Sequence, residues 1–474
     1  MANSEVAKWS NGGDLFLDLS PERGRGLRTR IENAIRDAIR SGRLPRDTVL
    51  PATRTLARDL GVSRGTVMQA YAQLTAEGWI TGRRGSGTRV AADRTTQTAK
   101  RPGLAAGAVR WRFDLRPGRP DASSFPRADW MRAQRRALAA APGDAFDYGR
   151  PEGMLALRLA LADYLARARG LRVSADDVIV TTGFTQSLSL IARALHGNGV
   201  TSIAMEEPSM PLHRSVVKEA GANLTMLRVD DAGAAVEQLA ALPDVQAAIL
   251  TPNHQHPTGA ALSPTRRATL LDWARTSDGY VVEDDYDGEF RYDGEPLGPV
   301  QGLDPSRVIY AGTVSKTLAP GVRLGWLIVP EPIRDMVLRQ RLLTDGHNGA
   351  LEQLTFTELL RSGGYDRHIR KMRLYYRRRR NTLLGALATR LPELGVAGAA
   401  AGLNLLIPLG DAEAEERVLR AASAASLGLG GMIEGRFYVN DPKPGILVGY
   451  AASPEHNFSQ SVDALVDALT VSVR

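Results

Sequence analysis

Six short apolar runs between residues 178 and 329 constrain the fold of this 474-residue chain more than any other feature. Each run is three or four residues long and nearly free of charge. Strands that are buried on both faces have this composition, and their alternation with helices is typical of a largely parallel α/β sheet. The expected strands are residues 178–181, 202–205, 247–250, 280–283, 308–310 and 326–329.

Chemically distinctive residues follow two of these runs, at the strand ends where open α/β sheets bind ligands. Lys316, one of only six lysines, stands between a serine and a threonine after the fifth run, and Asp284 and Tyr286 follow the fourth. Pyridoxal phosphate needs a lysine for a Schiff base, an acid that keeps its ring nitrogen protonated, and a phenol for its ring hydroxyl. Alone, each of these residues would more often be a surface or core-edge residue, so the prediction depends on their order along the chain.

The same cofactor needs groups that hold its phosphate. A turn formed by Gly183, Phe184 and Thr185 is expected to open a helix at Gln186, and a helix amino terminus is a good anion site. A hydroxyl and an arginine flank the lysine and complete the set of candidate phosphate ligands, which adds Thr313 and Arg323 to the turn.

Composition excludes several other classes of protein. The absence of cysteine rules out disulfides, Cys-ligated zinc, iron-sulfur clusters and thiol nucleophiles. We find no apolar run of about 18 residues and no apolar leader at the amino terminus, so we expect no membrane segment and a cytoplasmic location. We also expect no metal site, because the one close histidine pair, His254 and His256, lies in a turn that the fold itself explains.

Positive charge is concentrated near the amino terminus. Residues 23–90 contain fourteen arginines against five acids, a net charge of +9, so the rest of the chain sums to −1. A general preference for arginine would be the simpler explanation. A localised basic block is nevertheless the pattern expected of a surface that binds the phosphate backbone of a nucleic acid.

The basic block also has the pattern of a winged helix-turn-helix. Helical spacing of Ile31, Ile35 and Ile39 predicts a first helix, Thr53 is the expected N-cap of a second, and Ser63 that of a third. Two strand-like runs follow, at residues 79–81 and 88–90, joined by a glycine- and arginine-rich turn.

Several motifs in this block resemble the GntR-type DNA-binding domain. They include Leu50-Pro51-Ala52-Thr53-Arg54, Leu60-Gly61-Val62-Ser63-Arg64-Gly65-Thr66-Val67 and Gly85-Ser86-Gly87-Thr88. The resemblance covers residues 20–90 and implies a double-stranded DNA operator as partner. It also implies that the positions matching Arg54, Arg64, Thr66 and Gly87 contact the DNA. Any one arginine could instead only contact a DNA phosphate or simply face solvent.

Residues 91–112 have the composition of a linker, with no hydrophobic periodicity. We therefore expect a multidomain protein: a winged helix-turn-helix (α+β) domain over residues 1–90, a linker, and an α/β domain over residues 113–474.

The second region resembles fold-type I aminotransferases, which depend on pyridoxal 5'-phosphate, and its fusion to a GntR-like domain resembles the MocR family of regulators. This resemblance implies a homodimer and a small carboxy-terminal subdomain that begins near Leu338. Tyr148, in the segment Tyr148-Gly149-Arg150-Pro151-Glu152-Gly153, looks like the tyrosine that reaches the phosphate bound by the neighbouring subunit.

Three departures from the aminotransferase pattern limit what the resemblance implies. Met210 stands where an aromatic residue usually stacks on the cofactor ring, and His256 replaces the asparagine before the proline-threonine-glycine turn. The third concerns the arginine that binds a substrate α-carboxylate: none is found around Tyr450, and Arg436 is not at a matching position unless the alignment slips by a few residues.

These features give three hypotheses. The first is a pyridoxal phosphate-dependent transcriptional regulator that senses an amine-bearing effector, or pyridoxal phosphate itself, through Lys316. The second is a catalytically active aminotransferase with an accessory DNA-binding domain. The third, a dimerisation scaffold without cofactor, fits the intact cofactor motif least.

Overall fold

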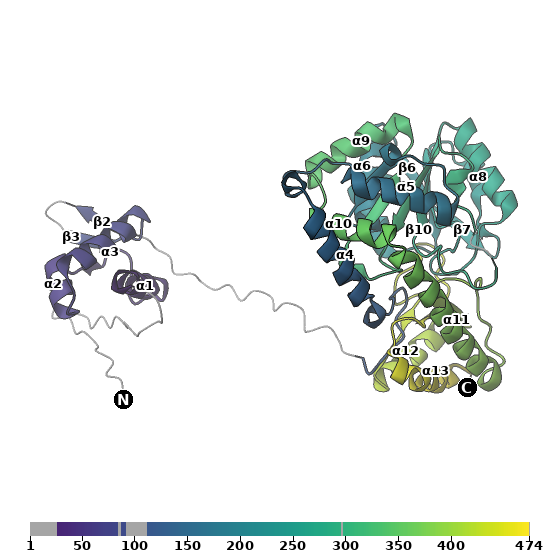
Figure 1. The fold of residues 1–474 in the computed structure, drawn as a ribbon. Coiled ribbons are helices and arrows are strands. Elements are labelled where there is room, and N and C mark those ends of the chain that lie inside the picture. The colour runs from purple at the N-terminus through teal and green to yellow at the C-terminus, as the bar shows by residue number, and fades with distance from the viewer. Residues whose placement is uncertain (1–25, 84–86, 92–110, 295–296, 474) are drawn as a thin grey trace. The chain divides into compact units, whose positions relative to one another are not determined.

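The computed structural model describes residues 26–83, 87–91, 111–294 and 297–473. The chain forms two compact units, Met1–Val109 and Arg110–Arg474 (Figure 1). Their division falls inside the predicted linker, most of which lies outside the described residues, so the domain limits 1–90, 91–112 and 113–474 remain predictions. None of the helices in the described ranges has the length and apolar character needed to cross a membrane.

The amino-terminal unit is a winged helix-turn-helix, as predicted (Figure 1). Ile31, Ile35 and Leu74 belong to its single hydrophobic core. Ser63 caps the third helix as expected, because its side chain accepts a hydrogen bond from the Thr66 amide at 3.1 Å. The elements are α1 (Leu27–Arg40), β1 (Val49–Leu50), α2 (Thr53–Asp59), α3 (Arg64–Ala76), β2 (Ile80–Arg83) and β3 (Gly87–Val90).

Two details of this unit differ from the prediction. Thr53 is the first residue of α2 rather than its cap, and the N-cap is Ala52, whose side chain has no hydrogen-bond acceptor. The wing has three strands instead of two, because β1 pairs antiparallel with β3. A two-residue strand is too short to show an alternating pattern in the sequence.

An eight-stranded sheet forms the centre of the second unit, in the order β5-β12-β11-β10-β9-β6-β7-β8. All six predicted runs are strands, and the sheet is largely parallel as expected. β12 runs antiparallel to both its neighbours, and β8 runs antiparallel to β7. The strands are β5 (Val178–Thr181), β6 (Ser202–Glu207), β7 (Asn223–Asp230), β8 (Gly233–Ala234), β9 (Ala247–Leu250), β10 (Tyr280–Asp285), β11 (Val308–Thr313) and β12 (Gly325–Ile328).

Burial on both faces explains why the predicted runs are continuously apolar. Ile179 and Leu327 point into one core, while Val180 and Trp326, their neighbours in sequence, point into another. β7 escaped prediction because most of its residues are only partly buried and its sequence carries no such run. The helices of this region are α4 (Arg127–Ala140), α5 (Leu155–Arg169), α6 (Phe184–Gly197), α7 (Pro211–Glu219), α8 (Pro264–Thr276), α9 (Glu331–Thr344) and α10 (Ala350–Arg361).

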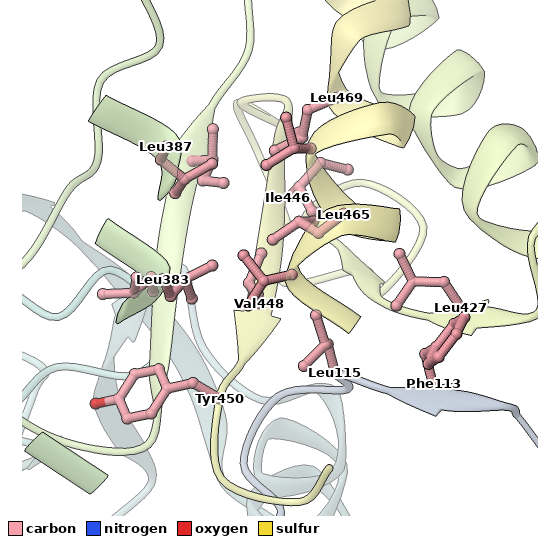
Figure 2. Packing of buried hydrophobic residues seen from close by; sticks show 14 of the residues in the cluster. Phe113, Leu115, Leu383, Leu387, Leu427, Ile446, Val448, Tyr450, Leu465 and Leu469 are labelled. Carbon is pink, nitrogen blue, oxygen red and sulfur yellow. The ribbon is translucent and has the colours of Figure 1, made fainter. Parts of the chain in front are cut away.

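A separate core holds the carboxy-terminal part together (Figure 2). Leu383 and Leu387 face Val448 and Leu465 there, and Leu115 joins them from the start of the unit. The elements are β4 (Phe113–Asp114), α11 (Gly364–Arg390), β13 (Asn404–Pro408), α12 (Ala412–Ala424), β14 (Leu427–Gly428), β15 (Gly430–Gly431), β16 (Gly445–Gly449) and α13 (Phe458–Val473).

The long helix α11 joins the two cores. Its early residues Tyr365 and Ile369 pack with the large-sheet core, whereas Met372 packs with the carboxy-terminal core. Leu338, near which the small subdomain was expected to begin, also packs against a core of the large sheet. The change of core therefore lies inside α11, after the predicted boundary.

Candidate cofactor site and DNA-binding surface

Lys316 lies in the loop after β11, at the carboxyl end of the parallel strands. Its Nζ donates a hydrogen bond to the carbonyl oxygen of Gly118 at 2.5 Å. Burial lowers the pKa of the Lys316 ammonium, although Asp287 and Asp284 act in the opposite direction. A lowered pKa increases the fraction of neutral amine, which is the nucleophilic form.

Asp284 is the second-to-last residue of β10 and lines the same cavity as this lysine. Its Oδ1 is buried and has no hydrogen-bond partner among the described residues, and burial, followed by Asp285 and Asp287, raises its pKa well above the usual value. The next residue points the opposite way: Asp285 is bound by Arg169 at 2.6 Å and by the Tyr310 hydroxyl at 2.7 Å. That pairing anchors the strand end, while Asp284, on the other face of the strand, points its carboxylate away from Arg169.

Tyr286 extends the site from the same strand end. Its hydroxyl lies 3.0 Å from His254 Nδ1, which is also 2.9 Å from Asp287 Oδ2. His256 packs edge-on against Tyr286 with ring centroids 5.9 Å apart. Burial and then the Lys316 charge lower the pKa of His256 to about 3, so this ring is neutral at physiological pH.

The amino terminus of α6 forms a small concave cradle. Gly183, its N-cap, has φ +113°, and a Cβ there would lie 3.5 Å from Arg323 Nη1, 3.9 Å from Thr313 Oγ1 and 4.0 Å from Ser315 Oγ. A guanidinium, two hydroxyls and a helix terminus thus converge on one point, as an anion site requires. The helix opens at Phe184, two residues before the predicted start at Gln186.

These groups line one cavity of about 400 Å³, a volume in the range of small-molecule sites. Nine predicted residues line it: Lys316, Asp284, Tyr286, Phe184, Thr185, Thr313, Arg323, His256 and Met210. Gly183 lies next to two of these lining residues, Arg323 and Thr313.

Tyr148 does not line the cavity of its own chain. Its side chain is 95% exposed, and its ring lies edge-on to that of His347, with ring centroids 6.4 Å apart. The expectation that it reaches a neighbouring subunit stays a prediction.

The cavity is also lined by residues that the sequence did not point to. Met210, at the predicted stacking position, lies beside His213 one helical turn further along α7, and the His213 ring packs against Phe184 at 4.9 Å. Burial lowers the pKa of His213 to about 4. A histidine three residues after the expected aromatic position was the only available signal.

Glu206 and Phe437 were also missed. Both line the cavity. Glu206 Oε2 accepts hydrogen bonds from the Thr251 hydroxyl at 2.6 Å and from Gln255, yet burial raises the pKa of Glu206 to about 7. Phe437 comes from the carboxy-terminal part, and only the folded chain brings it to Met210, more than 200 positions earlier in the sequence.

The cavity has no second arginine among its described lining residues that could bind a substrate carboxylate. Among the described residues that line the cavity, Arg323 is the only arginine. Arg436 has an exposed side chain, and its carbonyl accepts a hydrogen bond from Arg214. The Tyr450 hydroxyl donates to the carbonyl of Gly402 at 2.5 Å inside the carboxy-terminal core. Within the described ranges, no cluster of three or more potential metal ligands occurs either.

In the amino-terminal unit, the predicted DNA contacts lie at the amino ends of α2 and α3 and in the wing. Arg54 and Arg64 are exposed. Thr66 is half-buried, and its hydroxyl lies 2.8 Å from that of Ser63. Gly87 begins β3 with φ +80° and is exposed. Their roles as DNA contacts remain predictions.

Residues 27–90 match the family "Bacterial regulatory proteins, gntR family", and residues 117–428 match "Aminotransferase class I and II". The chain is 31% identical to the probable rhizopine catabolism regulatory protein MocR of Rhizobium meliloti over 93% of each chain. It belongs to the MocR family of helix-turn-helix transcriptional regulators.

Other comparisons agree with this membership in the MocR family. The chain is 34% identical to the pyridoxine biosynthesis transcriptional regulator PdxR of Corynebacterium glutamicum, over 79% of this chain and 82% of that protein. A kynurenine aminotransferase of Pyrococcus horikoshii superposes with a TM-score of 0.67 at 26% identity, over 76% of this chain and 91% of that one. An archaeal alanine:glyoxylate aminotransferase, with a TM-score of 0.70 at 23% identity over 89% and 96% of the two chains, shows the fold alone.

Proposed function

We propose that this MocR-family protein is a cytoplasmic regulator that holds pyridoxal phosphate at Lys316 and responds to an amine-bearing effector, or to pyridoxal phosphate itself, by changing its DNA binding. One observation carries the proposal: Asp284, whose buried Oδ1 has no partner in the part of the chain that the structure describes, lines the same cavity as the buried amine of Lys316. A buried polar atom without a partner costs about 1 to 3 kcal/mol, which a ligand that bonds it recovers.

The donor set fits pyridoxal phosphate group by group. Asp284 would bind the ring nitrogen, Tyr286 the ring hydroxyl, and the cradle around Gly183 and Arg323 the phosphate. When bound, the cofactor supplies an aldehyde that condenses with a primary amine. Because its pKa is lowered, Lys316 presents that amine in neutral form, and the Gly118 carbonyl orients it.

Dimerisation belongs to the same proposal. Tyr148 is exposed rather than engaged in its own cavity, and large apolar side chains are exposed on elements of the same unit. Exposed apolar surface of this kind marks interaction sites. These residues are Phe146 at 53%, Leu155 at 55%, Leu342 at 60% and Leu343 at 73% exposure.

An effector would act by favouring one conformation of the body over another. A coupling free energy of about 1 to 3 kcal/mol between the two sites changes DNA affinity by roughly 5 to 150-fold, so control requires no turnover. The effector must then displace or compete with Lys316 for the same aldehyde.

The substitution Lys316→Ala tests this mechanism. We expect wild-type protein with added pyridoxal phosphate to show a near-visible absorption band that borohydride fixes to the chain. Lys316→Ala should lose both the fixed label and the DNA-binding response to added amine or cofactor, while basal DNA binding persists. An unchanged response in this variant would refute the mechanism.

The alternative function, transamination, remains the second candidate, since the lysine and the acid of the aminotransferase pattern are both present. It predicts keto-acid formation from an amino donor by the same preparation. The lack of a second arginine among the described cavity residues disfavours ordinary amino-acid substrates.

A further inference from the structure

Helix α11 carries a second concentration of positive charge. Its 27 residues include nine lysines and arginines but a single acid, Asp366, and so contribute +8. Because acids elsewhere offset this charge, the near-zero sum over residues outside 23–90 conceals it.

The inward-facing cations of α11 have structural roles. Arg379 is buried, bonds the carbonyl of Ala451 at 2.8 Å and lies 4.5 Å from the ring centre of Phe458. Arg373 bonds the carbonyl of Glu289 at 2.8 Å. These contacts fix α11 to the two regions that it joins, so folding accounts for these residues.

The outward-facing cations have no such role. Arg370, Lys371 and Arg377 are exposed, and no hydrogen bond or ion pair forms between them and any other described residue. Arg367, which bonds the carbonyl of Ser362 at 3.0 Å, and Arg378, which pairs with Glu455 at 2.7 Å, extend the same face at helical spacing. This face extends over about 16 Å, from 11 steps of about 1.5 Å each, and it includes an exposed leucine, Leu374.

We propose that this outward face of α11 is a second DNA-binding surface, which binds the phosphate backbone of duplex DNA without reading its sequence. The charge is complementary: duplex DNA presents about one negative charge per 1.7 Å of axis, enough to meet the three cations without a partner among the described residues, Arg370, Lys371 and Arg377. The same chain carries a gntR-family DNA-binding domain, so duplex DNA is already a ligand of the protein. Arginine and lysine are also the residues that make most phosphate contacts.

Salt dependence tests the proposal directly. Full-length protein is titrated with a labelled duplex of mixed sequence, about 150 bp or one persistence length, at several salt concentrations. Each phosphate contact contributes about −0.9 to the slope of log affinity against log salt. The triple variant Arg370→Gln, Lys371→Gln, Arg377→Gln should reduce the magnitude of this slope by about 2 to 3.

A matched control carries the same loss of charge elsewhere. Arg193, Arg361 and Arg420 are exposed and lie on α6, α10 and α12. Their triple glutamine variant should keep the wild-type slope. Equal slope changes in both triple variants would show that only net charge matters and would overturn the proposal, as would an unchanged slope in the α11 variant.

A charge-preserving variant separates phosphate binding from a fold effect. Arg370→Lys with Arg377→Lys keeps both positive charges and should retain the wild-type slope. If this variant lost the slope to the same extent as the glutamine variant, the specific arginine packing would be the cause, and the face would not be a phosphate-binding surface. The inference is independent of whether the body senses an amine.

Discussion

Two sets of cavity residues keep the aminotransferase pattern to different degrees. The first set, from β10, β11 and the start of α6, contains every group predicted to hold the cofactor: Lys316, Asp284, Tyr286 and the cradle around Gly183. In the second set, from α7 and the carboxy-terminal part, a thioether stands at the stacking position, and no second arginine lines the cavity within the described residues.

This difference shows which demands a sensor shares with an enzyme. Both a sensor and an enzyme that hold this cofactor need the first set of residues, because the cofactor's ring and phosphate are the same in each. Gripping the carboxylate of an amino acid through successive turnovers requires an arginine that a sensor for another ligand can lose. The second set, together with Glu206, is therefore where we expect effector specificity to lie.

The largest effect on this comparison is expected from Asp284→Ala. The substitution removes the acid that we propose binds the ring nitrogen but leaves the cradle intact. A lost hydrogen bond to a charged group costs about 1.5 to 3 kcal/mol, or roughly 10 to 150-fold in affinity. Titration with pyridoxal phosphate followed by absorbance measures this loss. An affinity equal to that of the wild type would mean that Asp284 does not bind the cofactor as proposed.

A change in the pH dependence of stability is expected from Glu206→Gln. Burial raises the pKa of Glu206 to about 7 from a usual value near 4.5, so the folded state keeps a proton that the unfolded chain loses. Stability then falls as pH rises between these two values, by roughly 2 kcal/mol from this residue. Glu283, with the same raised pKa from burial, contributes a similar fall.

The change in unfolding free energy between pH 5 and pH 7 should therefore differ by roughly 2 kcal/mol between the variant and the wild type, as measured by denaturant unfolding at both pH values. The buried histidines His213 and His256 act in the opposite direction in both proteins, so the comparison with the wild type isolates Glu206. The same change in both proteins would show that Glu206 titrates normally in the folded protein.

The smallest effect is expected from Met210→Tyr, which restores an aromatic residue at the stacking position. Aromatic stacking contributes about 0.5 to 1.5 kcal/mol beyond burial, so cofactor affinity should rise by about 2 to 10-fold. The same absorbance titration measures it. Unchanged or weaker binding would indicate that His213 and Phe184 already enclose the cofactor ring and that Met210 does not contact it.

Much of this architecture could be predicted from sequence because its signals are local. Doubly buried strands leave continuous apolar runs, Ser63 caps the helix that follows it, and the motif around Lys316 occupies one short stretch. The errors were also local in origin. Thr53 and Ala52 are adjacent, and either can precede a helix, while β7 is only half-buried and leaves no apolar run.

What the sequence by itself determined is the set of chemical groups: a lysine, an acid, a phenol and phosphate ligands in order, joined to a winged helix-turn-helix. Tertiary structure decided which of them share a cavity, which atoms lack partners, and how charge is distributed. Phe437 reaches Met210 only through folding, and Asp285 meets Arg169 only there while Asp284 Oδ1 finds no partner among the described residues. The α11 cations separate into inner and outer faces only once the helix is packed. The physical reason is that burial and pairing depend on neighbours distant in sequence, whereas propensity and motif depend on neighbours nearby.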